Sequence, residues 1–130
     1  MSNAYPIITK ESKINTLLLP YILPFLSNSS SLILCPPIIY LSEVNEICKN
    51  TSIEIGAQEC SAHENGAFTG EVSAEMISGT GSEWVILGHS ERRQYHAENN
   101  ILLFDKLRAA HNAGLKVIFC VGETHQQYIK

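Results

Sequence analysis

Four short apolar runs, separated by stretches with helical signals, restrict the fold of this chain more than any other feature. The runs cover residues 32–35, 53–57, 84–88 and 116–121. They are mostly continuous rather than alternating and contain many β-branched residues, as expected for strands that are covered on both faces. Parallel neighbours require a crossover connection, and the helical stretches supply it. The sequence therefore predicts an α/β fold built from parallel βα repeats.

The clearest predicted helix spans residues 101–113. Leu103, Leu107 and Ala110 share one face of it, and Gly114 stands where the helix should end. This segment would cover one face of the sheet.

Three other helices have weaker signals. One is expected to begin at Ser42, after two prolines that hold the backbone extended, and another near Ser73, with Glu75 in its first turn. A further helix is expected over residues 11–26, where prolines make it short or kinked at its far end.

Size and composition favour a single domain. A chain of 130 residues with 45% apolar content can bury one core. We expect one unit over residues 1–130, in which residues 1–31 form a degenerate N-terminal helix region and residues 32–130 carry the βα units.

Charge, hydropathy and cysteine spacing exclude several classes of function. Nine Lys and Arg scattered among thirteen Asp and Glu give a net charge of −4, which leaves no basic surface for nucleic acid. The longest apolar runs are too short for a membrane span and no secretory signal is visible, so a cytoplasmic location is expected. Four widely spaced cysteines match neither a metal site nor a disulfide scaffold. We expect reduced, mostly buried thiols and no metal.

The segment from Gly88 to Arg93 contains the densest group of chemically active side chains. It follows the third apolar run directly, and sites in parallel α/β folds form at the carboxyl ends of strands. Gly88 lets the backbone turn without a side chain, which would aim His89 over the strand end. A helical turn beginning there would favour a neutral imidazole that donates a hydrogen bond. In the alternative without a catalytic role, His89 caps a turn while Glu91 and two arginines form a solvated ion-pair network.

A long connection between Cys60 and Ser73 is the second candidate. It is longer than the usual strand-to-helix connection and holds two glycines and Phe68. Either it is a flexible surface excursion, or it protrudes and docks into another subunit with Phe68 as the apolar anchor.

Glu123 closes the last apolar run and would face the same edge of the sheet as His89. A lone carboxylate at that place is more often a cap or an orienting acceptor than a base. The four remaining histidines lack metal-ligand spacing and are expected to lie at the surface.

Together these segments resemble the triosephosphate isomerase family. Residues 84–93 resemble its fourth-strand signature, and residues 65–73 resemble its dimer loop. Residues 57–58, 35–37 and 120–123 also fall in the family's order and at its spacing. The resemblance covers roughly residue 32 to the C-terminus. It implies a half TIM barrel in which residues 32–130 hold βα units 2 to 5.

The resemblance also implies a chemistry. The family interconverts dihydroxyacetone phosphate and glyceraldehyde 3-phosphate without a cofactor, using a glutamate base and a neutral histidine that polarises the carbonyl. Carried over, His89 would be the electrophile, with Ser90 and Glu91 supporting it. Thr69 would reach the partner subunit's active site, and Asn3 would bind substrate. The implied dimer loop includes Phe68, Thr69, Gly70 and Glu71.

Several catalytic parts of the family have no counterpart in these 130 residues. Tyr5 stands where the family's first-strand lysine belongs, and the glutamate base, the lid and the phosphate loops belong to later strands. Without the base and lid, proton abstraction has no acceptor and the enediol would be exposed to water. We therefore expect no isomerase activity from the chain alone, and triose phosphate as a substrate only after complementation.

Two partner relationships remain open from the sequence. A half barrel leaves strand edges unpaired, which predicts self-association, a homodimer through residues 65–71, or capture by a complementary half. The alternative is a non-catalytic remnant or interaction module that binds a full-length isomerase.

Overall fold

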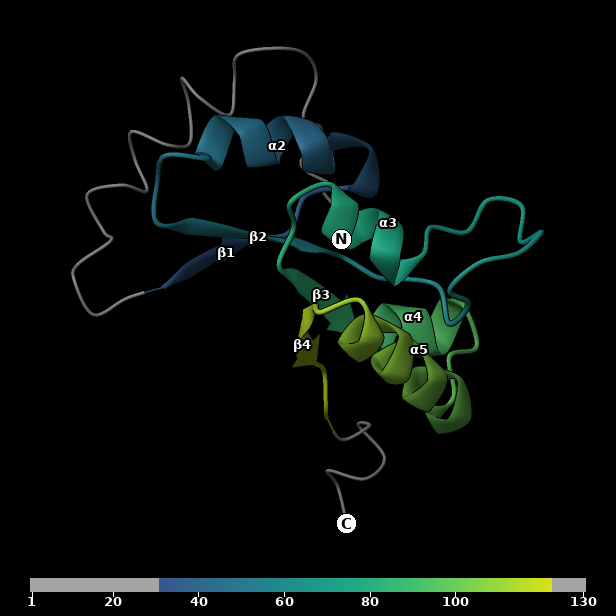
Figure 1. Ribbon diagram of the computed structural model, residues 1–130. Coiled ribbons are helices and arrows are strands. Elements are labelled where there is room, and N and C mark those ends of the chain that lie inside the picture. Colours follow the sequence, from purple (N-terminus) through teal and green to yellow (C-terminus); the bar gives the residue numbers. More distant parts are fainter. Residues whose placement is uncertain (1–30, 123–130) are drawn as a thin grey trace.

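Four parallel strands form one sheet in the computed structural model, which describes residues 31–122 (Figure 1). The strand order follows the sequence, and each strand pairs in parallel with the next. All four predicted strands are confirmed. The strands are β1 (Leu32–Leu34), β2 (Ile53–Ala57), β3 (Trp84–Leu87) and β4 (Lys116–Phe119).

Helices connect the strands, as the βα pattern predicted. The helices are α2 (Leu41–Cys48), which follows a 3-10 turn η3 (Ile38–Tyr40), α3 (Ala74–Gly79), α4 (Ser90–Tyr95) and α5 (Asn100–Asn112). The first begins one residue before the expected Ser42. The helix predicted near Ser73 and the one predicted over residues 101–113 are both present.

Side-chain caps define where two of these helices begin. The Ser73 hydroxyl accepts a hydrogen bond from the Met76 amide at 3.2 Å, and the Asn99 side chain accepts one from the Leu102 amide at 2.9 Å. These contacts satisfy amides that have no partner inside the helix. Gly114, with φ of 75°, provides the left-handed residue that ends α5.

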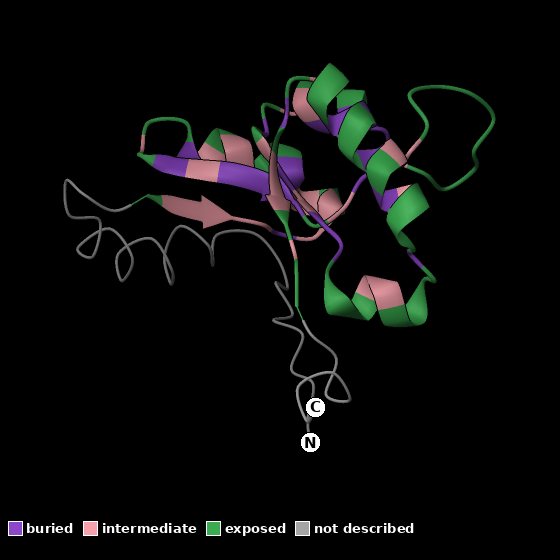
Figure 2. Ribbon diagram, turned by 90° about the horizontal axis from the view of Figure 1, so that it is seen from below, coloured by how far each residue is buried: buried purple, intermediate pink, exposed green. Residues whose placement is uncertain are grey.

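The core lies between the sheet and the helices. In β3, Val85 and Leu87 are buried and alternate with half-buried residues, so one face of the strand meets the helical layer. Leu41, Ile77 and Leu103 bring the helices to that core and are themselves fully buried. Figure 2 shows buried residues concentrated between these layers, whereas the outer helix faces are exposed.

The opposite face of the sheet is only half buried. Ile86 and Ile118 are paired in register there and are of intermediate exposure. Within residues 31–122, β1 and β4 are the edge strands, as expected, and no described element covers this second face. In a closed barrel this face would point inward.

Several predictions lie outside the described residues. They are the helix over residues 11–26, the substrate-binding role of Asn3, and the placement of Glu123. Of the four free thiols, Cys48 and Cys60 are buried, and Cys35 and Cys120 are half exposed. Over residues 31–122, no helix has both the length and the apolar character needed to cross a bilayer.

Candidate functional site

The turn that follows β3 places His89 at the carboxyl edge of the sheet. Gly88 is buried and has φ of 74°, a conformation that favours glycine. A Cβ added at Gly88 would lie 3.3 Å from the Cys120 carbonyl oxygen. His89 follows as the N-cap of α4, so the helical turn considered from the sequence is present.

One hydrogen bond orients the imidazole of His89, and the Glu91 carboxylate lies near the same ring nitrogen. The His89 Nδ1 accepts a hydrogen bond from the Glu91 amide at 3.4 Å, and Glu91 Oε2 lies 3.6 Å from the same nitrogen. Ser90 is the first residue of α4 and is exposed. Glu91 therefore lies against the ring rather than in an ion pair with the arginines that follow it.

The arginine after Glu91 belongs to a separate group of charges, which we call the buried cluster: Glu59, Arg92, Glu98 and Lys106. Lys106 Nζ contacts Glu98 Oε1 at 2.7 Å and Glu59 Oε2 at 2.9 Å. Arg92 Nε contacts the same Glu98 oxygen at 2.7 Å. The Glu98 side chain is 2% exposed and that of Lys106 is 5% exposed. The solvated network considered from the sequence is wrong for Arg92, whose charge pairs with the buried Glu98, whereas the capping role considered there for His89 is confirmed.

Pairing within the buried cluster outweighs the cost of burial. Burial by itself would raise the pKa of Glu98, but hydrogen bonds from Lys106 and Arg92 hold that pKa below its usual range. Burial would likewise lower the pKa of Lys106, and the hydrogen bonds that Lys106 donates to Glu98 and Glu59 raise it instead. Both groups are therefore charged at neutral pH. Glu98 Oε2 is buried too, and no group within residues 31–122 donates to it.

Burial also controls the thiol nearest to this cluster. It raises the pKa of Cys60 to about 12. Cys60 is therefore a protonated core residue at neutral pH, and it is not a nucleophile.

The connection between Cys60 and Ser73 protrudes from the body of the protein (Figures 1 and 2). Its base is closed by the Ser61 amide donating to the Val72 carbonyl at 2.9 Å. The Asn112 side chain of α5 donates to Glu64 at 2.8 Å and ties the loop to the helical layer. The loop is thus a braced projection, and its docking into another subunit stays a prediction.

Phe68 occupies the exposed part of this loop. Its ring stacks on the ring of His63 with centroids 3.6 Å apart, and it remains 43% exposed. Gly66, with φ of 124°, passes so close beneath Phe68 that an added Cβ would lie 2.7 Å from the ring. Thr69, Gly70 and Glu71 are also exposed. Within residues 31–122, no hydrogen bond or ion pair joins residues 65–71 to His89.

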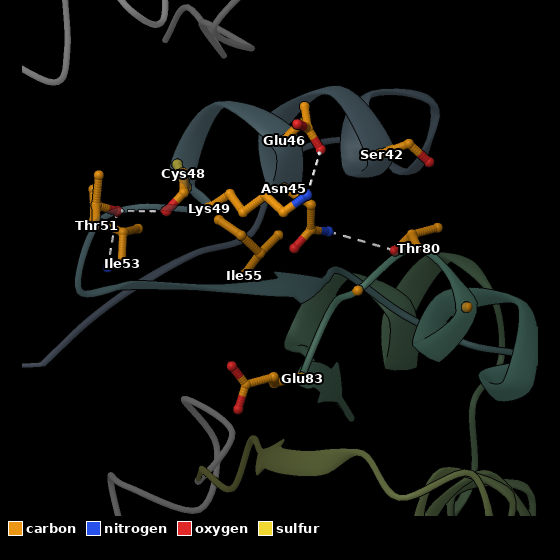
Figure 3. Close-up of a pocket in the computed structure, with 12 residues that line it drawn as sticks. Ser42, Asn45, Glu46, Cys48, Lys49, Thr51, Ile53, Ile55, Thr80 and Glu83 are labelled. Atoms are coloured by element: carbon orange, nitrogen blue, oxygen red, sulfur yellow. Dashed lines mark hydrogen bonds and ion pairs between the residues drawn. The ribbon is translucent and has the colours of Figure 1, made fainter.

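A cavity of about 480 Å³ lies between α2, α3 and the start of β2 (Figure 3). Asn45 of α2 points across it and donates to Thr80 at 3.5 Å and to Ser82 at 2.9 Å. Residues preceding β2 and β3 line this cavity, so it opens at the amino ends of the strands. Active sites in parallel α/β folds lie at the opposite, carboxyl ends of the strands, where His89 is found. The cavity is therefore not the candidate site.

Comparison with known proteins identifies the family. Residues 10–130 match the family described as triosephosphate isomerase. The chain belongs to the triosephosphate isomerase family. It is 49% identical over 96 residues to triosephosphate isomerase from Hahella chejuensis, covering 74% of this chain and 39% of that protein. It is 46% identical over 97 residues to the enzyme from Xylella fastidiosa strain M12, covering 75% of this chain and 39% of that protein.

A solved triosephosphate isomerase has the same fold. The crystal structure of the Bartonella henselae enzyme superposes with a TM-score of 0.84 and 32% identity, covering 95% of this chain and 51% of that one. The fold is thus a partial TIM barrel, as predicted. The matched part of the chain spans 39% of the length of each of these two curated triosephosphate isomerases.

The sequence predicted the turn that carries His89, but it did not reveal the side chains that hold this turn in place. Arg93 bonds to three separate elements, and Lys106 is a buried cation on a helix face that we expected to be apolar. The i, i+3 spacing of Leu103 and Lys106 was the available signal. Leu107, expected on the core face, is 36% exposed and lies at its margin. Over the described range, no group of three His, Cys, Asp or Glu side chains is arranged to hold a metal ion.

Proposed function

We propose that this chain supplies the electrophilic half of a triosephosphate isomerase centre, with His89 polarising the substrate carbonyl. The observation that carries the proposal is the position of His89 as N-cap of α4 at the carboxyl edge of the sheet. Its Nδ1 accepts from the Glu91 amide, so in the neutral ring the proton is on Nε2. That nitrogen can donate to a carbonyl oxygen on which negative charge develops.

Isomerisation also needs a proton acceptor on the other side of the substrate. Among the described residues, the carboxylate beside His89 is Glu91, and it lies on the Nδ1 side of the ring. Glu91 and Ser90 therefore fit supporting roles and not that of the base. We propose that the base and the groups that bind phosphate come from the family's later βα units, and that these 130 residues by themselves do not turn over triose phosphate.

Complementation tests this proposal. The purified chain is assayed for conversion of glyceraldehyde 3-phosphate alone and after mixing with a polypeptide that carries the family's later βα units. We expect no turnover alone and turnover on mixing. The His89→Ala chain should lower the complemented rate by about 10²-fold or more, because one preorganised donor is lost. Turnover by the 130-residue chain alone, or none at any mixing ratio, would contradict the proposal.

We also propose that residues 65–71 dock into a second copy of the chain, with Phe68 as the apolar anchor and Thr69 beside it. The braced base of the loop and the exposed ring support this, since a pre-ordered projection loses little entropy on binding. Light scattering after size exclusion gives the oligomeric state. We expect Phe68→Ser to shift the dimer to monomer, whereas Phe104→Ser, at an exposed phenylalanine outside the loop, should not.

The interaction-module alternative predicts a different result. In that case the chain would bind a full-length isomerase through Phe68, yet no complementary half would restore turnover. We place either activity in the cytoplasm, where glycolytic substrates occur.

A further inference from the structure

The guanidinium of Arg93 lies between the carboxyl ends of β3 and β4. Its Nε donates to the Gly88 carbonyl at 2.8 Å, and one terminal nitrogen donates to the Cys120 carbonyl at 3.4 Å. The other terminal nitrogen donates to the Asn100 side chain at 3.0 Å, at the start of α5. One side chain of α4 thereby joins three other elements.

The bond to Gly88 acts on His89 through the peptide plane. The Gly88 carbonyl and the His89 amide belong to one planar unit, so fixing the oxygen fixes the direction in which the His89 Cα leaves the strand. Gly88 has a positive φ and no side chain of its own to restrain this peptide. An added Cβ at Gly88 would lie 2.9 Å from an Arg93 terminal nitrogen. Arg93 thus packs directly against the peptide that it orients.

We infer that Arg93 is a positioning residue for His89. It holds the Gly88–His89 peptide so that Nδ1 meets the Glu91 amide and Nε2 keeps the proton. The inference rests on the proposed function for its catalytic meaning, but the positioning itself needs no substrate. A planar guanidinium with fixed donor directions suits three acceptors in three elements, and a lysine ammonium does not reproduce this arrangement.

The test uses ¹⁵N NMR of the full chain without substrate to determine which nitrogen of the His89 ring carries the proton. The variants are Arg93→Met and Arg93→Lys, and the His89→Gln chain assigns the signal. Arg108→Met is the matched control, because Arg108 is an exposed helical arginine that forms an ion pair with the nearby Asp105. In the unsubstituted chain we expect Nδ1 to be the unprotonated nitrogen. Both Arg93 variants should move the ring toward a mixture of tautomers, whereas Arg108→Met should leave it unchanged.

Several outcomes would overturn the inference. One is an unchanged His89 spectrum in a folded Arg93→Met chain, and another is full rescue by lysine, which would make charge alone sufficient. A general loss of amide dispersion in Arg93→Met would also overturn it, since Arg93 would then hold the fold rather than one peptide.

Complemented enzyme, where obtained, gives a separate readout. In the complemented enzyme, we expect Arg93→Met to lower kcat by about 10²-fold with little change in KM, as for a misplaced catalytic group. A tautomer change without any complemented activity would leave the positioning role standing and remove the proposed function.

Discussion

Two groups of charges in this protein each join one lysine to two glutamates, yet they lie in opposite surroundings. In the buried cluster, Lys106 contacts Glu98 and Glu59 at 2.7 and 2.9 Å. In a second group, which we call the exposed cluster (Glu54, Glu83 and Lys116), Lys116 contacts both glutamates at 3.0 Å. The Lys106 side chain is 5% exposed and that of Lys116 is 51% exposed. The contacts are nearly alike, and the solvent around them differs.

The two clusters have similar contact distances, but they should contribute differently to the stability of the fold. Charges in water interact weakly and are screened by salt, so an exposed pair adds little to stability. Buried charges have lost their hydration, and each depends on its partner to offset that loss. The buried cluster joins the loop after β2 to α4 and α5, beside the His89 turn. The exposed cluster joins the amino ends of β3 and β4 to β2, on the half-buried face of the sheet.

Removing the buried lysine should have the largest effect on stability. Lys106→Met leaves Glu98 buried with Arg92 as its remaining cationic partner, and removal of one member of a buried pair costs about 3–5 kcal/mol. Urea denaturation followed by circular dichroism measures this loss. The double variant Lys106→Met with Glu98→Gln should lose less than the sum of the two single variants, because the unpaired charge is gone. Additive losses would show that the two groups act independently.

The second prediction concerns pH and Glu98. The folded pKa of Glu98 lies below that of an unfolded glutamate, so its contribution is present above the unfolded pKa and is lost as the pH falls through the folded one. Glu98→Gln should cost about 1.5–3 kcal/mol at pH 7, because bonds to a charged acceptor are lost. The difference between the two proteins should shrink as the pH falls below roughly 4.5. A difference that stays constant with pH would contradict the ionic role.

The comparison also shows what the sequence could and could not predict. Strands, helices and the His89 turn follow from local signals: continuous apolar runs, Ser73 and Gly114 at helix ends, and Gly88 before the histidine. The buried cluster joins residues up to 47 positions apart, and no local pattern indicates that Glu59 and Lys106 meet. Arg93 has the same limitation, since its acceptors become neighbours only when β3 and β4 pair. The resemblance indicated the candidate site, and the fold showed what supports it.

The smallest effect is expected at the exposed cluster. Hydrogen bonds from Trp84 and from Lys116 lower the pKa of Glu54, and bonds to Glu54 and Glu83 raise that of Lys116, yet water surrounds the cluster. Lys116→Met should therefore change the urea midpoint far less than Lys106→Met, and the change should vanish in about 1 M salt. Lys116 Nζ lies 5.0 Å from the Trp84 ring centre, and Trp84 is the one tryptophan of the chain.

Tryptophan emission therefore reports the loss of this lysine directly, even where stability hardly changes. A destabilisation as large as that of Lys106→Met, and insensitive to salt, would break the comparison. It would mean that the half-buried face of the sheet is covered in solution by a second copy or a complementary half, so that Lys116 is desolvated as Lys106 is. Dilution separates these two cases, because only coverage by a second chain weakens with falling protein concentration.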